Sequence, residues 1–226
     1  MPVKDGPGLG IEVEHVANAA HVFGVIAAIL MLVWCLHYRG GLNLNSSDAD
    51  HIFNVHPVLM FVGFILFSGE AIMAYKTVRE ERRKRKLVHL ALHLIAGLMG
   101  LIGVIAAFKY HGESELPNMY SLHSWLGMAT ICLFGLQWLI GFITFWYPGA
   151  AILTRTRFRP WHIFSGLTIF IMAICTAETG LVSKAQFLSL TLGDEALMIK
   201  MIGLTVLLFG ISVGLCVSSN DNDGPL

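Results

Sequence analysis

Long apolar runs alternate with short polar segments along the whole chain. The dipeptide Arg159-Pro160 is expected to lie in the polar segment before the fifth run. The six runs cover residues 16–38, 52–75, 87–109, 121–147, 161–183 and 195–218. Each has the roughly 20 mostly apolar residues that a helix needs to cross a bilayer. The first run is too long for a cleaved signal peptide, and the residues before it are acidic. We therefore predict an all-α membrane protein with six transmembrane helices in one domain, residues 1–226, without a separate soluble catalytic domain.

Composition agrees with this prediction, and the distribution of charge indicates the orientation of the protein in the membrane. The chain has 226 residues, 55% of them hydrophobic and 13% charged, which excludes a disordered chain and an ordinary soluble domain. The net charge is zero, which argues against a nucleic-acid partner. Loops 76–86 and 148–160 hold ten Lys and Arg residues, whereas the loops near 39–51, 109–120 and 184–195 hold three. Because basic loops stay in the cytosol, we expect the first two loops and both termini there.

Four histidines stand near the starts of four consecutive spans: His56, His89, His123 and His162. Successive spans run in opposite directions, so spans two and four begin at one face of the membrane and spans three and five at the other. This parity pairs His56 with His123 and His89 with His162, one pair near each face. Two imidazoles at matched depth on facing helices are the axial ligands of a b-type haem. The pattern favours two haems, while a histidine-lined proton or metal path and a zinc site remain alternatives.

His93 competes with His89 because it lies one turn further along the same helix face, roughly 6 Å deeper. The depth of the pair favours His89, since His162 stands at the very start of its own span. The four cysteines lie in four different spans, and no C-x-x-C-H motif is present for covalent haem attachment. Any haem is therefore expected to be bound non-covalently.

Three motifs then give a specific resemblance: SLHSW at 121–125, HYRGGL at 37–42 and FNVHPV at 53–58. The chain resembles the cytochrome b-561 family of transmembrane ascorbate-dependent reductases over roughly residues 20–218. The resemblance implies a central four-helix bundle, helices 2–5, that holds two b-type haems with the same histidine pairing. It further implies electron transfer from cytosolic ascorbate through both haems to a non-cytosolic acceptor, monodehydroascorbate or a ferric chelate. A haem-binding membrane anchor that feeds a partner enzyme is the alternative.

The resemblance also implies an assembly, a location and substrate sites. Family members form homodimers, and we expect this chain in an endomembrane (vacuolar or secretory vesicle) or in the plasma membrane. Arg82, Lys86 and Arg155 are similar in position to basic residues that hold the ascorbate anion on the cytosolic side. His111 and Tyr120 match residues of the acceptor site on the non-cytosolic side, where both side chains can hydrogen-bond or pass a proton. Four further cations of the first basic loop are expected to serve topology alone: Arg79, Arg83, Lys84 and Arg85.

Two carboxylates lie inside predicted spans, Glu70 and Glu178. Glu70 is close enough to the cytosolic interface to be partly solvated. Glu178 lies six residues inside the outer end of the fifth span, and charges buried in a membrane are expensive and usually paired. We therefore hypothesise an ion pair between Glu178 and Lys200 that joins the sixth helix to the central bundle.

Overall fold

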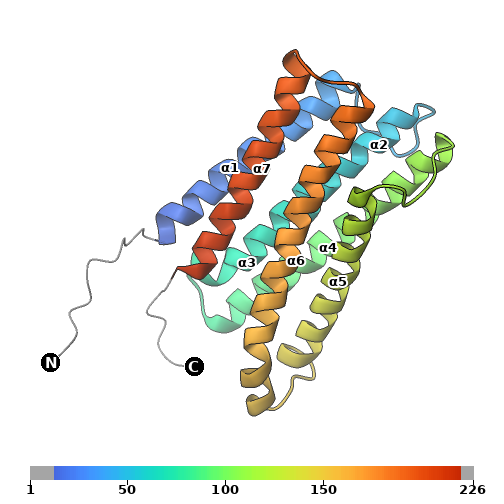
Figure 1. The fold of residues 1–226 in the computed structure, drawn as a ribbon. Coiled ribbons are helices and arrows are strands. Elements are labelled where there is room, and N and C mark those ends of the chain that lie inside the picture. Colours follow the sequence, from blue (N-terminus) through green and yellow to red (C-terminus); the bar gives the residue numbers. More distant parts are fainter. Residues whose placement is uncertain (1–12, 220–226) are drawn as a thin grey trace.

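The protein is described by a computed structural model that covers residues 13–219, and six long helical spans run up and down through it (Figure 1). The first span is α1 (Val13–Val33) continued by the π-helix η1 (Trp34–Tyr38). The second is α2 (Ala49–Val58), the π-helix η2 (Leu59–Leu66) and α3 (Phe67–Thr77). The remaining four are α4 (Arg82–Glu113), α5 (Leu122–Phe145), α6 (Ile152–Phe187) and α7 (Asp194–Ser218). All six are long and apolar enough to cross a membrane, and residues 13–219 contain no strand, so the predicted all-α, six-helix fold is confirmed.

The start of the fifth span differs from the prediction. We expected Arg159-Pro160 to precede that span, but α6 begins at Ile152 and Pro160 lies inside it. A proline in a helix leaves the carbonyl four residues earlier without its N–H partner. Here that carbonyl belongs to Thr156, an exposed residue in the first turns of α6 where water can replace the missing donor. The helix therefore continues through the proline.

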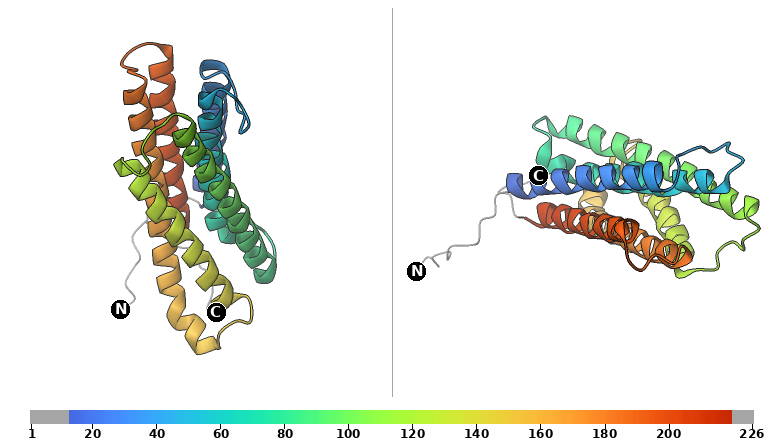
Figure 2. Two further views of the ribbon diagram at one scale, coloured as in Figure 1. Left: turned by 90° about the vertical axis from the view of Figure 1, so that its right-hand side faces the viewer. Right: turned by 90° about the horizontal axis from the view of Figure 1, so that it is seen from above.

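Four of the spans form a central bundle (Figures 1 and 2). The α4 helix packs against the second span on one side and against α5 on the other, α5 packs against α6, and α6 closes the ring against η2. The α1 and α7 helices pack on each other outside this ring, and α7 also contacts α3 and α6. The predicted bundle of helices 2–5 is thus present, with the first and last spans attached to one flank.

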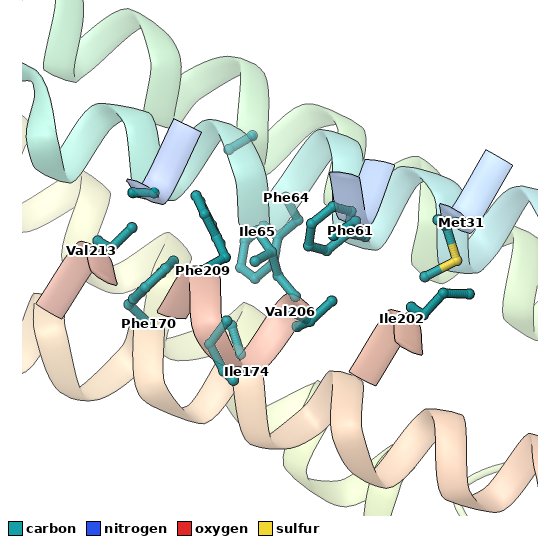
Figure 3. Packing of buried hydrophobic residues seen from close by; sticks show 14 of the residues in the cluster. Met31, Phe61, Phe64, Ile65, Phe170, Ile174, Ile202, Val206, Phe209 and Val213 are labelled. Carbon is teal, nitrogen blue, oxygen red and sulfur yellow. The ribbon is translucent and has the colours of Figure 1, made fainter. Parts of the chain in front are cut away.

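Aromatic rings and aliphatic side chains together fill the space between the second span, α6 and α7 (Figure 3). Phe61 and Phe64 of η2 are almost fully buried, as is Phe209 of α7. The Phe209 ring centroid lies 6.3 Å from that of Phe61 and 6.2 Å from that of Phe170 on α6, and both contacts are edge-on. Edge-on aromatic pairs stabilise beyond the area they bury. This packing fixes α7 and the second span against the bundle that carries the histidines.

The two ends of the bundle differ in charge. The α3–α4 and α5–α6 connections lie at one end, where α1 begins and α7 finishes (Figure 1). We call it the basic end because α4 opens with the sequence RRKRK and α6 with ILTRTRFR. The other three connections lie at the opposite end. Most of the basic residues assigned to loops 76–86 and 148–160 therefore stand on the first turns of helices, which gives their side chains fixed directions.

Candidate functional site

The four predicted haem ligands meet as two pairs inside the central bundle. The ring centroids of His56 and His123 are 6.0 Å apart, and those of His89 and His162 are 6.3 Å apart. Two imidazoles bonded to opposite sides of one metal ion, each through a bond of about 2 Å, place their ring centres roughly 6 Å apart. Each pair therefore already has the separation that a shared metal ion requires.

Hydrogen bonds fix the orientation of these rings. Three of the four Nδ1 atoms donate to a backbone carbonyl on a neighbouring helix. Nδ1 of His56 donates to the carbonyl of Gly103 (2.9 Å), Nδ1 of His89 to that of Ala71 (2.8 Å) and Nδ1 of His123 to that of Thr176 (2.9 Å). Because a carbonyl only accepts, Nδ1 carries the hydrogen and Nε2 keeps its lone pair. Metal-binding histidines are usually held in this way.

The fourth ring, His162, has a side-chain partner instead. The amide nitrogen of Gln137 on α5 lies 3.0 Å from His162 Nδ1 and also donates to the His162 carbonyl (2.7 Å). The amide oxygen of Gln137 accepts from Ser165 Oγ at 3.0 Å. A half-turn of this amide would present its oxygen to His162 Nδ1 and leave Nε2 of the imidazole free for a metal ion, at the expense of the hydrogen bond to the His162 carbonyl. The sequence contained no signal for Gln137, because its role depends on the packing of α5 against α6.

Two glycines give the rings on α5 and α6 their space. A Cβ added to Gly180 of α6 would lie 2.7 Å from Cε1 of His123 on α5. A Cβ added to Gly141 of α5 would lie 2.9 Å from Cε1 of His162 on α6. Each of these helices thus presents a glycine to the imidazole of the other, and a larger residue would displace that ring.

His93 lies beside the pair at the basic end but is not opposed to His162 in the same way. Its ring centroid is 4.6 Å from that of His89 and 5.5 Å from that of Phe134. Its Nδ1 is buried and has no hydrogen-bond partner among residues 13–219. The ring that faces His162 at the separation for a shared ion, with Nδ1 anchored, is His89. The geometry therefore favours His89 as the ligand.

The three predicted ascorbate-binding cations gather at the basic end. Arg82 and Lys86 lie on the first turns of α4, and Arg155 lies on the first turn of α6. Lys86 is within electrostatic range of both arginines. Its Nζ donates to the carbonyl of Phe145 at 3.1 Å, and the ring of Phe145 is 5.2 Å from that of His162. The cations are thus connected to the His89/His162 pair through one aromatic residue.

Three of the four cations that we expected to serve topology have partners of their own. These are Arg79 with Glu14 (3.7 Å), Lys84 with Glu80 (3.0 Å) and Arg85, which donates to the Tyr75 carbonyl (3.0 Å). The first two pairs are exposed, so each contributes little to stability.

A cavity opens at the opposite end of the bundle beside the other histidine pair. His56 and His123 line it, together with His111 and Tyr120. The rings of His111 and Tyr120 are 5.9 Å apart, and His111 Nδ1 donates to the Pro117 carbonyl at 3.0 Å. The sequence-based acceptor residues therefore do reach the space beside the paired imidazoles.

The hypothesis of an ion pair between Glu178 and Lys200 is wrong. Lys200 is exposed, and its Nζ donates to the carbonyl of Thr191 at 3.4 Å. Glu178 points instead at Gly203 of α7, where a Cβ would lie 2.9 Å from Oε2, and its buried Oε1 has no hydrogen-bond partner among the described residues. A long lysine side chain near a helix start extends toward the polar boundary, which takes its ammonium away from the carboxylate.

The other intramembrane carboxylate does have a partner. Glu70 Oε1 lies 2.9 Å from Nδ1 of His21 on α1, and both side chains are part-exposed on the outside of the bundle. The sequence had not linked these two residues, because they belong to different spans and face each other only after α1 docks on α3.

Comparison with known proteins identifies the family. Residues 55–188 match the family model of the eukaryotic cytochrome b561 proteins, and the four paired histidines lie within the match. The chain belongs to the cytochrome b561 family. Transmembrane ascorbate ferrireductase 2 of Arabidopsis thaliana is 48% identical over 194 residues, 84% of this chain and 84% of its own. Probable ascorbate-specific transmembrane electron transporter 1 of Oryza sativa subsp. japonica is 46% identical over 211 residues, 91% and 90% of the two chains.

A mammalian relative matches this chain over a similar length of sequence. Transmembrane ascorbate-dependent reductase CYB561 of Mus musculus is 37% identical over 200 residues, 86% of this chain and 78% of its own. Membership of the family, together with the six spans, makes the chain an integral, multi-pass membrane oxidoreductase of electron transport with b-type haem.

The two histidine pairs fit a haem better than a bare metal ion. Among residues 13–219, no group of three or more His, Cys, Asp or Glu side chains could hold an ion together. A haem brings four nitrogen ligands of its own and needs only two axial ones from the protein. Each pair offers two opposed imidazoles, and three of the four Nδ1 atoms are already bonded to backbone carbonyls.

Proposed function

We propose that this cytochrome b561 carries single electrons from cytosolic ascorbate, by way of two non-covalently bound b-type haems, to a non-cytosolic acceptor. The acceptor would be monodehydroascorbate or a ferric chelate. The single observation that carries the proposal is the presence of two opposed histidine pairs, at 6.0 and 6.3 Å, in one membrane-spanning bundle. A b-type haem with two histidine ligands is six-coordinate and supplies reversible one-electron transfer between its ferric and ferrous forms.

His89 and His162 would be the axial ligands nearer the basic end, and His56 and His123 those nearer the opposite end. The bundle holds three of these rings rigidly through backbone carbonyls and the fourth through Gln137. Rigid ligands favour electron transfer because they limit the rearrangement that accompanies a change of charge. The π-helix η2 begins two residues after Pro57, which directly follows His56. Such wide turns often lie at functional sites, and this one lies between the two histidine layers.

The donor would bind at the basic end. Ascorbate is a monoanion at neutral pH, and a cluster of Arg82, Lys86 and Arg155 attracts and holds an anion. Lys86 joins the cluster to the carbonyl end of α5, one aromatic ring from His162. The names of the Arabidopsis and rice relatives state that those proteins use ascorbate, which supports ascorbate as the donor here. The basic residues also support a cytosolic position for this end.

The acceptor would bind at the opposite end, where His111 and Tyr120 line the cavity of His56 and His123. Tyr120 is 63% exposed, so an incoming molecule can reach its hydroxyl. Both side chains can donate or accept a hydrogen bond, and a histidine can exchange a proton near neutral pH. Assembly as a homodimer and residence in an endomembrane or the plasma membrane stay predictions.

Electron transfer across sealed vesicles tests the proposal. Purified protein is reconstituted with ferricyanide trapped inside, and ascorbate is added to the face that presents the basic end. The wild type should reduce the trapped ferricyanide. Lys86→Gln removes a charged contact worth about 1.5–3 kcal/mol, so the ascorbate concentration for half-maximal rate should rise by roughly tenfold or more.

Lys84→Gln is the matched control, because Lys84 lies on the same turn of α4 but pairs with Glu80. It should leave the ascorbate dependence unchanged, and both variants should retain wild-type haem content and full reduction by dithionite. If Lys84→Gln weakens the ascorbate dependence as much as Lys86→Gln, the binding role of Lys86 is wrong. If ascorbate leaves the wild-type protein oxidised, the proposed donor is wrong.

A further inference from the structure

A lysine is buried at the opposite end of the bundle, where the function described above does not use it. Lys184 lies one turn before the end of α6, is only 8% exposed, and lines the cavity that contains His56 and His123. An ionisable side chain buried within a membrane-spanning helix is costly and usually marks a functional position.

The groups around the Lys184 ammonium use only part of its capacity to donate hydrogen bonds. Its Nζ lies 3.8 Å from the ring centroid of Phe53, 5.4 Å from that of Tyr110 and 5.1 Å from that of Phe187. Aromatic faces stabilise a cation but accept no strong hydrogen bond. Within residues 13–219, the carboxylate within ion-pair distance is that of Asp50, at 3.7 Å, and its side chain is 53% exposed. An ammonium has three N–H donors, so Lys184 can still bind another acceptor.

The cavity itself selects an anion. Its described lining includes three histidines and two tyrosines but no aspartate or glutamate, and Lys184 is its one Lys or Arg residue. The rest of the described lining is mostly apolar. A positive charge that is buried beside a mostly apolar cavity attracts a negatively charged group more strongly than an exposed charge does, because water screens it less.

The position of Lys184 relative to His123 indicates which anion this is. Gly180, where an added Cβ would lie 2.7 Å from Cε1 of His123, is four residues before Lys184 and therefore on the same face of α6. Lys184 thus stands one turn closer to the membrane boundary than the imidazole. A haem has one edge with two propionate carboxylates and an otherwise apolar ring, so the carboxylate edge is expected on the boundary side of the ligand pair.

We propose that Lys184 binds a propionate carboxylate of the haem held by His56 and His123. This inference rests on the proposed function, because it requires a haem in this cavity. The ammonium stabilises the reduced iron site, which carries one positive charge fewer than the oxidised site, and so raises its reduction potential. Asp50, whose carboxylate lies 3.7 Å from the ammonium and is half-exposed, offsets part of this effect. Lys184 therefore makes the site at this end a better electron acceptor, and Asp50 limits the gain.

A redox titration of the purified full-length protein, followed by absorbance without ascorbate or acceptor, tests the proposal. The two haem components are assigned with His123→Leu and His162→Leu, which should each remove one. Lys184→Gln should lower the equilibrium constant for reduction of the His56/His123 component tenfold, which is a fall of about 59 mV in its one-electron reduction potential. The other component should keep its potential. Lys184→Arg should restore most of the shift, and Asp50→Asn should move the same component upward.

Lys109→Gln is the matched control. Lys109 lies at the same end of the bundle, but its Nζ donates to the Leu44 carbonyl at 2.8 Å and it does not line the cavity. It should shift neither component. If Lys184→Gln does not retain haem, the upward shift in Asp50→Asn still decides the question.

Two results would overturn the proposal: no shift in Lys184→Gln with both haems retained, or equal shifts in both components. These outcomes differ from failure of the proposed function, in which His123→Leu would leave the haem content unchanged.

Discussion

Gly180 is a position at which one added methyl group should act directly on a predicted haem ligand, His123. Gly180→Ala adds one methyl group on the face of α6 that supports His123. The added carbon would lie 2.7 Å from Cε1 and 2.9 Å from Nδ1 of the imidazole. We predict that this single carbon displaces the ring and weakens or abolishes haem binding by the His56/His123 pair.

The size of the displacement follows from the contact distances. Ordinary contacts between such atoms begin at about 3.4 Å, so the imidazole must move by about 0.7 Å to accommodate the methyl group. A binding group generally has to stay within about 0.5 Å of its productive position. The movement also disrupts the 2.9 Å hydrogen bond from His123 Nδ1 to the Thr176 carbonyl, and a buried donor without a partner costs about 1–3 kcal/mol.

The assay is the haem-to-protein ratio of purified variants, with reduced-minus-oxidised spectra. Gly180→Ala should lose or weaken one of two haems. Gly141→Ala should affect the other, because a Cβ there would lie 2.9 Å from Cε1 of His162. Gly135→Ala on α5 is the matched control, since no described atom outside its own stretch of helix lies within 4 Å of its added methyl group, and it should retain both haems. If Gly180→Ala keeps both haems and an unchanged spectrum, or Gly135→Ala loses as much, the supporting role of Gly180 is refuted.

Substitutions at three further positions test the pair at the basic end. His93→Phe should retain both haems whereas His89→Leu should lose one, because His89 faces His162 with its Nδ1 anchored. The haem-to-protein ratio measures this. If His93→Phe loses a haem and His89→Leu does not, His93 is the ligand instead of His89. Gln137→Glu should lower the reduction potential of the His89/His162 component and Gln137→Leu should not, since a carboxylate that accepts from His162 Nδ1 makes the imidazole more electron-rich. Equal potentials in both variants would show that Gln137 does not act on His162.

The pairing of the histidines could be predicted from the sequence because it depends only on the order of the spans. Helices that alternate in direction bring every second helix start to the same face, and the structure brings together the same rings: His56 with His123, and His89 with His162. The six spans were predictable for a similar reason. A run of about 20 apolar residues has few structural alternatives to a membrane helix.

The residues that support the rings could not be predicted, because they depend on which faces of separate helices meet. Gln137, Gly141 and Gly180 contact the imidazoles only through the packing of α5 against α6. The wrong prediction of a Glu178–Lys200 ion pair has the same origin. Depth in the membrane was readable from the sequence, but the direction in which each side chain extends was not.

The stoichiometry of haem in the wild-type protein tests the central claim most directly. The measurement is the haem-to-protein ratio of the purified chain, combined with its absorbance spectrum before and after addition of ascorbate. Two opposed histidine pairs predict two haems per chain and a change to the reduced b-type spectrum on addition of ascorbate. A ratio of one or less, or a spectrum that ascorbate leaves in the oxidised form, would contradict it.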